Sequence, residues 1–259
     1  MTLLVVFILA ILQGITEFFP VSSSGHLVLG QHWLAVSSPG IALEIALHLG
    51  TLLSVMVVFH KDIVMLLQAG FSIINLRQTQ RSSKDTSRKL LWLLIISSVP
   101  TAVIAIIFDP LFDRLFNSPR MVGYALMFTA TVLYFAKGRE GSASTDQIGL
   151  KRGLMVGVAQ GISIIPGVSR SGLTIATGLF CGLSRETATK FSFLLSLPAI
   201  AGAALVKLPE LINCGLGYPL SWLLLGMVIS AITGIVAIKT LLYLLRKNYL
   251  RYFAYYVGL

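Results

Sequence analysis

Polar side chains that could do chemistry interrupt an apolar stretch near the start of the chain. They are Gln13, Glu17, Ser22, Ser23 and His26. Carboxylate, hydroxyl and imidazole groups serve general acid–base and nucleophilic catalysis, and this stretch offers all three through Glu17, the serines at 22–24 and His26. Gln13 and Glu17 are four residues apart and share one face of a helix. Their oxygens could hold a divalent cation whose shell is completed by phosphate oxygens and water.

A second group of polar residues lies in the apolar stretch PGVSRSGLT, residues 166–174. Its glycines let the backbone turn so that several N–H groups converge on an anion. A helix should begin near Ser171, and a helix N-terminus attracts negative charge. The Arg170 guanidinium adds donors that match phosphate oxygens. We therefore predict an anion site with Arg170 at its centre, supported by Gly167, Ser169, Ser171 and Thr174.

Ionisable groups within apolar sequence need a reason to be there. An isolated charge at the centre of a membrane helix costs about 2.5–3.5 kcal/mol on insertion scales. Glu17, His26 and Arg170 are therefore candidates for a functional site. The structural alternative is an ion pair between Glu17 and Arg170 that only ties two segments together. Glu44 and His48 are also four residues apart, but no third ligand is evident, and this favours a polar contact within a helix bundle.

The composition sets the class of protein. The chain has 259 residues, of which 56% are hydrophobic and 12% are charged, and its 20 Lys and Arg outnumber its 10 Asp and Glu. A typical soluble domain is about 25% charged. The composition excludes a disordered chain, a nucleic-acid-binding arm and an ordinary cytosolic enzyme. The two cysteines have no metal-site or disulfide spacing, and no basic residue precedes the first apolar stretch, as it would in a signal peptide.

Apolar segments long enough to be membrane spans alternate with polar segments. The candidates are near 41–59, 90–108, 121–136, 187–206 and 219–245, and a last one begins near 249. If 61–89, 137–152, 185–190 and 239–251 are cytoplasmic, 16 of the 20 basic residues lie inside and three lie outside. Such an asymmetry predicts the orientation of the chain.

The two polar groups belong to an internal repeat. Residues 13–27 and 160–174 are identical at seven of 15 positions at a constant offset of 147. Three predicted spans separate the two copies, and an odd number of spans inverts the second copy. Broken apolar segments at matching places in two halves indicate a binding site near the membrane midplane. We predict repeat one over about residues 1–136 and repeat two over about 148–259.

Each copy of the repeat should form a re-entrant hairpin. Residues 3–12 are apolar but fall well short of the roughly 20 residues that cross a bilayer. Proline breaks a helix, and non-helical backbone at membrane depth survives only where it is buried in protein or lines a wet cavity. The predicted fold is one all-α polytopic membrane domain over 1–259, with an inverted-topology repeat, about six full transmembrane helices and two re-entrant helix hairpins.

Three motifs resemble those of one family. The stretch LQGITEFFPVSSSGH at 12–26 resembles the first signature of the bacterial undecaprenyl-diphosphatases of the bacitracin-resistance type. IIPGVSRSGLT at 164–174 resembles the second signature, and FSFLLSLPA at 191–199 also matches. The final apolar segment, from Tyr249 to Leu259, is shorter than the usual closing helix of the family.

The resemblance implies a multi-pass enzyme of the bacterial cytoplasmic membrane with an inverted repeat. Such enzymes remove the terminal phosphate of undecaprenyl diphosphate, recycle the lipid carrier for cell-wall synthesis and give bacitracin resistance. The resemblance also implies a divalent cation, Mg²⁺ or Ca²⁺. It puts functional positions at Gln13, Glu17, Ser22, Ser23, His26, Pro166, Gly167, Ser169, Arg170, Ser171 and Thr174, with Ser22 among the substrate-binding residues.

Some questions stay open at the level of sequence. The nucleophile or proton donor could be His26 or Ser23, and Glu17 could activate the attacking group or bind the cation. The alternative function is a transporter or flippase for a polyprenyl phosphate or another organic anion, because inverted repeats with midplane anion sites are typical of transporters. We expect a polyprenyl diphosphate lipid as the partner and no nucleic acid. The family resemblance favours a site that opens to the outer face, and small-residue stripes would allow a homodimer.

Overall fold

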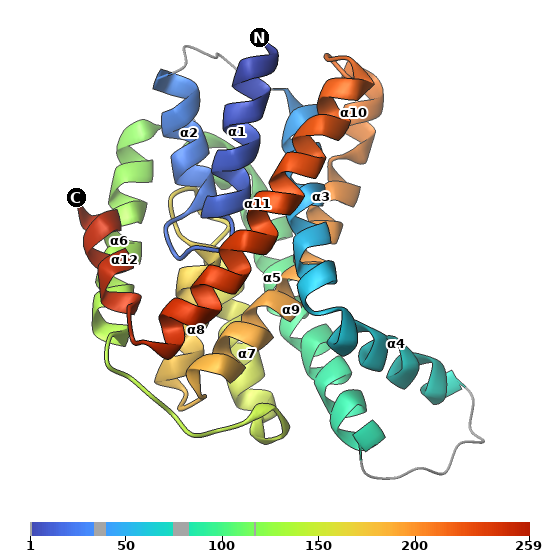
Figure 1. The fold of residues 1–259 in the computed structure, drawn as a ribbon, viewed down its shortest axis with the longest axis vertical. Helices are drawn as coiled ribbons and strands as arrows, with labels where there is room; N and C mark the ends of the chain where they lie inside the picture. The colour runs from blue at the N-terminus through green and yellow to red at the C-terminus, as the bar shows by residue number, and fades with distance from the viewer. Residues whose placement is uncertain (1, 34–39, 75–82, 117) are drawn as a thin grey trace.

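The computed structural model is an all-helical bundle (Figure 1). It describes residues 2–33, 40–74, 83–116 and 118–259. The helices in chain order are α1 (Leu3–Thr16), α2 (Ser23–Trp33), α3 (Ile41–Val58), α4 (His60–Ile74), α5 (Ser83–Phe116), α6 (Pro119–Ala136), α7 (Leu150–Ile162), α8 (Arg170–Phe180), α9 (Arg185–Val206), α10 (Leu208–Cys214), α11 (Leu220–Arg246) and α12 (Leu250–Gly258).

Four of the predicted spans are helices long and apolar enough to cross a membrane. They are α3, Thr86–Phe108 within α5, α9 with α10, and α11. The predicted segment 121–136 lies in α6, which has 18 residues, but Pro119 and Arg120 at its start lower its mean hydropathy. The last predicted span is α12, which has nine residues and therefore a length of about 13 Å. The chain is a multi-pass membrane protein, and the count of six spans stays a prediction.

The two polar motifs lie in the loops of two short-helix hairpins, α1–α2 and α7–α8. In Figure 1, α1 and α2 lie at one end of the bundle, α7 and α8 lie at the other, and each hairpin turns in the middle. Helix α1 has 14 residues and helix α7 has 13. At 1.5 Å per residue each is roughly 20 Å long, about two thirds of the hydrocarbon thickness. Both loops therefore lie inside the bundle and away from its ends.

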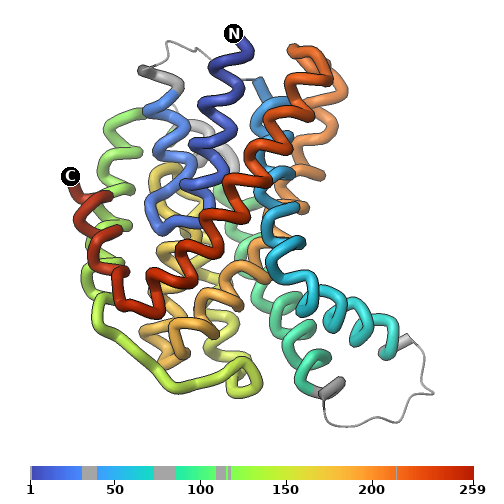
Figure 2. Tube along the Cα trace, viewed as in Figure 1, coloured from blue at the N-terminus to red at the C-terminus, as the bar shows by residue number. Residues whose placement is uncertain are grey.

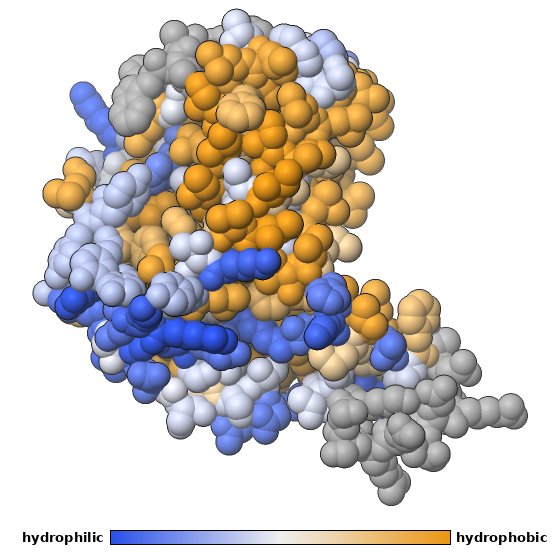
Figure 3. Space-filling model, viewed as in Figure 1, coloured by the Kyte–Doolittle hydropathy of each residue, from blue (hydrophilic) through white to orange (hydrophobic). Residues whose placement is uncertain are grey.

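Hydrophobic and hydrophilic surfaces occupy different parts of the molecule. On the face drawn in Figure 3, hydrophobic residues cover the upper part, and hydrophilic residues gather across the lower end. The same lower end carries the 137–149 connection and the turn between α11 and α12 (Figure 2). Lys137 and Arg139 lie in the connection, Lys247 lies in the turn, and Arg246 is the last residue of α11. The predicted basic segments thus share one end of the bundle, although residues 75–82 of the 61–89 segment lie outside the described residues.

Small residues allow the hairpins to approach the long helices closely. A Cβ atom on Gly14 would lie 2.7 Å from the Ser230 carbonyl oxygen of α11, and one on Gly157 would lie 2.0 Å from the Ser97 carbonyl oxygen of α5. Thr101 of α5 donates a hydrogen bond of 3.0 Å to the Gly157 carbonyl. Helix association in lipid depends on such close backbone contacts, because lipid tails are as apolar as leucine.

A Gly157→Ala substitution should destabilise the protein by roughly 1–3 kcal/mol, because the new methyl group would overlap the backbone of α5. Gly123 of α6 is the matched control, since a Cβ there meets nothing within 4 Å. Gly123→Ala should leave stability unchanged or raise it by up to about 1 kcal/mol, the difference in helix propensity. Thermal unfolding in detergent measures both variants. Equal effects at the two positions would contradict the proposed role of the α5–α7 contact.

Candidate functional site

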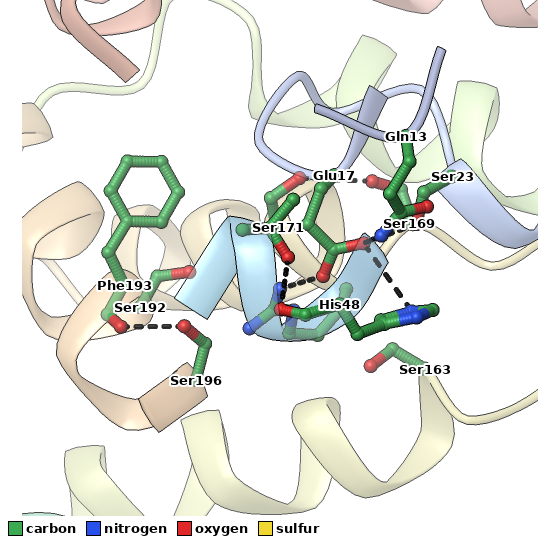
Figure 4. Close-up of polar contacts among 12 residues, drawn as sticks. Gln13, Glu17, Ser23, His48, Ser163, Ser169, Ser171, Ser192, Phe193 and Ser196 are labelled. Atoms are coloured by element: carbon green, nitrogen blue, oxygen red, sulfur yellow. Dashed lines mark hydrogen bonds and ion pairs between the residues drawn. The ribbon is translucent and has the colours of Figure 1, made fainter. Parts of the chain in front are cut away.

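Glu17 lies at the end of α1 and is held from two sides. The neighbouring Phe18 is fully buried, and its ring packs edge-on against Phe193 of α9 at a centroid distance of 5.4 Å. Around the carboxylate, Gln13 Nε2 donates to Glu17 Oε2 at 2.9 Å and Ser23 Oγ donates to the same oxygen at 2.6 Å (Figure 4). The Phe18 ring and the two hydrogen-bond donors fix the position of the Glu17 carboxylate. Glu17 is only 7% exposed.

Arg170 comes to the same carboxylate from the other hairpin. It is the first residue of α8, and its Nη2 forms an ion pair with Glu17 Oε1. The two side chains are 15% and 7% exposed. A buried ion pair loses much of its attraction to the cost of desolvation, so its presence is weak evidence of a stabilising role. The ion pair does establish that the predicted catalytic carboxylate of Glu17 and the predicted anion-binding guanidinium of Arg170 belong to one site.

The site contains polar atoms that have no partner in the described part of the chain. Gln13 Oε1 and Arg170 Nη1 are buried side-chain atoms without a hydrogen bond. Leaving a buried polar group unsatisfied costs about 1–3 kcal/mol, and more for a charged one. One acceptor and one charged donor beside Glu17 are therefore suited to a ligand that brings a cation and an anion.

The loops are shaped by unusual backbone angles and by direct contact. Ser22 has φ of +71° and Gly167 has φ of +93°. A Cβ on Gly167 would also lie 2.5 Å from the Val122 carbonyl oxygen of α6, so this position needs glycine for two reasons. The Gly167 N–H donates to Ser24 Oγ at 3.2 Å and joins the second loop to the first turn of α2.

The predicted hydroxyl groups are buried and already bonded within the protein. Ser169 caps α8 by accepting from Gly172 N–H at 3.1 Å, and Ser171 Oγ donates to the Phe19 carbonyl at 3.0 Å. Thr174 is fully buried and forms a 2.6 Å hydrogen bond with Ser192 of α9. Ser22 Oγ accepts from Gly25 N–H at 3.2 Å. These contacts organise the loops, and direct substrate binding by the four hydroxyl groups stays a prediction.

His26 lies on α2 and faces α12. Its Nδ1 is 2.8 Å from the Ser22 carbonyl oxygen, its Nε2 is 2.9 Å from the Tyr256 hydroxyl, and the His26 and Tyr256 rings stack. Among the described contacts, none joins His26 to Glu17, Ser23 or Arg170. The catalytic role predicted for His26 stays a prediction, and the contacts of Ser23 with Glu17 make Ser23 the better placed nucleophile.

Two residues of the site were not assigned to it from the sequence. His48 of α3 lies with Nε2 4.0 Å from Glu17 Oε2 (Figure 4). Thr129 of α6 donates to the Gly167 carbonyl at 3.2 Å and accepts from the Ser169 N–H at 3.0 Å, so it supports the anion loop. The sequence signal for His48 is its spacing of four residues from Glu44 in an apolar segment. In the structure His48 Nδ1 bonds the backbone carbonyl of Glu44 and not its carboxylate. Nothing in the sequence distinguishes Thr129.

The residues around Glu17 fit a divalent cation in part. No group of three His, Cys, Asp or Glu side chains suited to a metal ion occurs among the described residues. Gln13 nevertheless offers a buried oxygen without a partner, and its amide touches the Glu17 carboxylate. A carbonyl-type oxygen and a carboxylate oxygen are ligands that Mg²⁺ and Ca²⁺ accept.

An apolar groove lies beside the anion loop, between α6, α7 and α8. Its volume is about 610 Å³, and Leu173 and Thr177 of α8 form one of its walls. The opposite walls include Phe128 of α6 and Val158 of α7, and Lys151 is the charged residue among the lining side chains. Leu173 is three residues from Arg170. The groove therefore runs along α8, whose first residue is Arg170.

Comparison with known proteins identifies the family. Residues 6–259 match the family model described as bacitracin resistance protein BacA. A relative from Desulforapulum autotrophicum, named undecaprenyl-diphosphatase, is 43% identical over 96% of this chain and 92% of its own length. Relatives of the same name from Alkaliphilus metalliredigens and Methanosphaera stadtmanae are 41% and 38% identical, over 99% and 96% of this chain and 95% and 92% of their own lengths. The chain belongs to the BacA family.

Membership of the BacA family confirms the resemblance drawn from the motifs. The match includes both hairpin loops, the long helices and α12. The two loops that carry the motifs are also the two that meet in the structure, through the ion pair of Glu17 with Arg170 and the bond of Ser24 with Gly167.

Glu17→Gln and Arg170→Gln should each destabilise the protein, because each leaves one charge of the pair buried and unpaired. The double variant should lose less stability than the two single losses added together, with a coupling of about 1–3 kcal/mol. Equilibrium unfolding in mixed micelles measures the cycle. The control cycle is the exposed pair of Arg246 and Glu186, whose side chains are 69% and 66% exposed and should show little coupling. Strict additivity at Glu17 and Arg170 would contradict the buried pair.

Proposed function

We propose that this chain is an undecaprenyl-diphosphate phosphatase. It hydrolyses undecaprenyl diphosphate to undecaprenyl phosphate and inorganic phosphate, and so recycles the lipid carrier of cell-wall synthesis and gives bacitracin resistance. The support comes from the BacA family and from relatives named undecaprenyl-diphosphatase that cover nearly the whole chain. A transporter or flippase is not favoured, since none of these names describes transport.

One observation about the site supports the proposal most directly. Arg170 has one nitrogen on Glu17 and a second nitrogen that is buried without a partner. The same carboxylate accepts a hydrogen bond from the Ser23 hydroxyl. Three groups therefore converge from two hairpins: the Arg170 guanidinium that can donate to an anion, the Ser23 hydroxyl as nucleophile, and the Glu17 carboxylate as its base. Phosphoryl transfer depends on this kind of positioning and charge stabilisation.

The reaction follows from these contacts in two steps. The terminal phosphate binds at Arg170 and at the start of α8, where the helix dipole favours negative charge. Ser23 Oγ attacks the terminal phosphorus and passes its proton to Glu17, while the bond to the bridging oxygen breaks and undecaprenyl phosphate leaves. Water then attacks the phosphorus of the phosphoserine as its bond to Ser23 Oγ breaks, Glu17 returns the proton it took to Ser23 Oγ, and inorganic phosphate leaves as dihydrogen phosphate with both protons of the water. The charge that develops on the equatorial oxygens is stabilised by Arg170.

A divalent cation, Mg²⁺ or Ca²⁺, completes the proposed site. Gln13 and Glu17 would hold it, and when bound it would neutralise charge on the phosphate oxygens. The support is the Gln13 amide, whose nitrogen contacts the Glu17 carboxylate and whose oxygen is buried without a partner. Substrate oxygens and water would supply the remaining ligands.

We place the protein in the bacterial cytoplasmic membrane with its basic end in the cytoplasm. The site then opens to the outer face. Glu17 is 7% exposed, His48 and Glu44 beyond it are 39% and 38% exposed, and Lys207 near the opposite end from the basic loops is 51% exposed. Exposure therefore increases from the buried carboxylate toward the predicted outer end. A homodimer stays a prediction.

The proposal includes an inverted-topology repeat of residues 1–136 and 148–259. The support is a crossed pattern of packing: α1 of the first half packs on α11 of the second, and α7 of the second half packs on α5 of the first. Gly14 meets α11 at Ser230 and Thr233, and its repeat partner Gly161 meets α5 at Ile104. Such exchanged contacts are expected where a two-fold pseudosymmetry axis relates the halves.

Purified protein in detergent should release phosphate from undecaprenyl diphosphate when Mg²⁺ or Ca²⁺ is present, and chelation should abolish the release. Glu17→Ala, Arg170→Ala and Ser23→Ala should each lower kcat/KM by more than about 100-fold, which corresponds to about 2.7 kcal/mol of barrier. The control is Glu186→Gln, which changes an exposed carboxylate at the surface. Detergent removes the two compartments, so transport does not register. No release by folded wild-type protein would favour the transporter alternative.

The polyprenyl tail should lie in the apolar groove that begins near Leu173. Val158→Trp narrows this groove and should lower kcat/KM for the long-chain substrate at least tenfold, while hydrolysis of a short-chain prenyl diphosphate is unchanged. Leu224→Trp is the matched control, because Leu224 is an exposed apolar residue of α11 outside the groove. Steady-state kinetics with both substrates measures the difference. Equal losses on long and short chains would contradict this assignment of the groove.

A further inference from the structure

A hydrogen bond defines which ring nitrogen of His48 carries a proton, and the other ring nitrogen faces the site. Its Nδ1 is 2.9 Å from the Glu44 carbonyl oxygen, one helical turn earlier. A carbonyl oxygen only accepts, so Nδ1 carries a proton and donates it. In the neutral ring Nε2 then has a free lone pair, and it is this nitrogen that lies 4.0 Å from Glu17 Oε2. Histidines that bind metal ions are typically oriented in this way, by a bond from the other ring nitrogen to a backbone carbonyl.

The distance between Nε2 and the carboxylate fits an ion between them. At 4.0 Å the two atoms are too far apart for a direct hydrogen bond. Two ligands at about 2.1 Å from one cation lie between about 3 and 4.2 Å apart, depending on the angle at the ion. His48 is also 39% exposed on its side chain, so an ion can reach it.

Gln13 supplies a third donor atom at the same place. Its side chain is fully buried, its Nε2 lies 2.9 Å from the same oxygen of Glu17, and its Oε1 has no partner. Rotation of the amide by 180° exchanges the oxygen and the nitrogen. The oxygen would then face Glu17 Oε2, the same carboxylate oxygen that His48 Nε2 approaches, and a cation stabilises such a group of acceptors.

We propose that His48 is a ligand of the divalent cation, together with Gln13 and Glu17. The site then has one nitrogen and two oxygens from three segments: α1, the turn after it, and α3. An imidazole ligand suits Mn²⁺ and other transition metals better than it suits Ca²⁺, which prefers oxygen. The site should therefore bind Mn²⁺ more tightly than Ca²⁺. This inference rests on the proposed function for the presence of a cation, and its test needs no substrate.

The experiment uses Mn²⁺ alone as the probe, on the full-length protein in detergent. Mn²⁺ binding is followed by its EPR signal, and a nitrogen ligand is detected by electron spin echo modulation from ¹⁴N. Wild-type protein should bind one Mn²⁺ and show imidazole modulation. In His48→Gln the modulation should disappear and the dissociation constant should rise at least about tenfold, as expected when a metal-ligand contact is lost.

His60→Gln is the matched control. His60 Nδ1 also lies 2.9 Å from a backbone carbonyl oxygen, that of Val57, and this histidine is at the junction of α3 and α4. The control should keep both the modulation and the affinity of wild-type protein. Glu17→Gln should lose Mn²⁺ binding, which places the observed ion in this site. Circular dichroism and size exclusion establish that each variant is folded.

Three results would overturn the proposal: ¹⁴N modulation that persists in folded His48→Gln, an unchanged Mn²⁺ affinity in that variant, or no saturable Mn²⁺ binding by wild-type protein. Phosphate release is assayed separately on the same preparations. Loss of the nitrogen ligand in His48→Gln supports the inference even if the wild-type protein releases no phosphate, so the two failures are distinguishable.

Discussion

The meeting of Glu17 and Arg170 in one ion pair is the constraint that the two hairpins have to satisfy. Each residue is at the turn of a different hairpin, and each would be costly alone in the interior of a membrane protein. Their pairing requires both hairpins to end at the same depth. The short helices, the positive φ angles and the glycine at 167 all serve to bring two non-helical turns together. The pair also leaves a buried nitrogen of Arg170 free for a ligand.

Close helix packing makes that meeting possible. The hairpins fit against α5 and α11 because glycine replaces a side chain where the backbones touch. Between these contacts, Phe18 fills the space among α3, α9 and α11, so the carboxylate beside it cannot swing into the core. In lipid such steric fit has the role that hydrophobic burial has in water.

The same architecture suits an amphipathic substrate. A polar site lies inside the bundle, and an apolar groove begins next to it on the helix that carries Arg170. A diphosphate with a polyprenyl tail has these two parts in the same order. Hydroxyl groups predicted to bind substrate help to hold this geometry: Ser169 and Ser171 bond backbone groups, and Thr174 bonds the Ser192 hydroxyl. Their direct contact with substrate stays a prediction.

The sequence by itself determined the class of protein and most of the site. Its hydropathy predicts the long helices, and the repeated motifs single out Gln13, Glu17, Ser23 and Arg170, because polar residues and turn formers stand out in an apolar chain. Only the tertiary structure decided which of these side chains meet. It joins Ser23 to Glu17, turns His26 toward Tyr256, and brings His48 from a separate helix to the carboxylate. Spacing along a chain predicts neighbours on one helix, whereas contacts between helices depend on packing and rotation that no local pattern records.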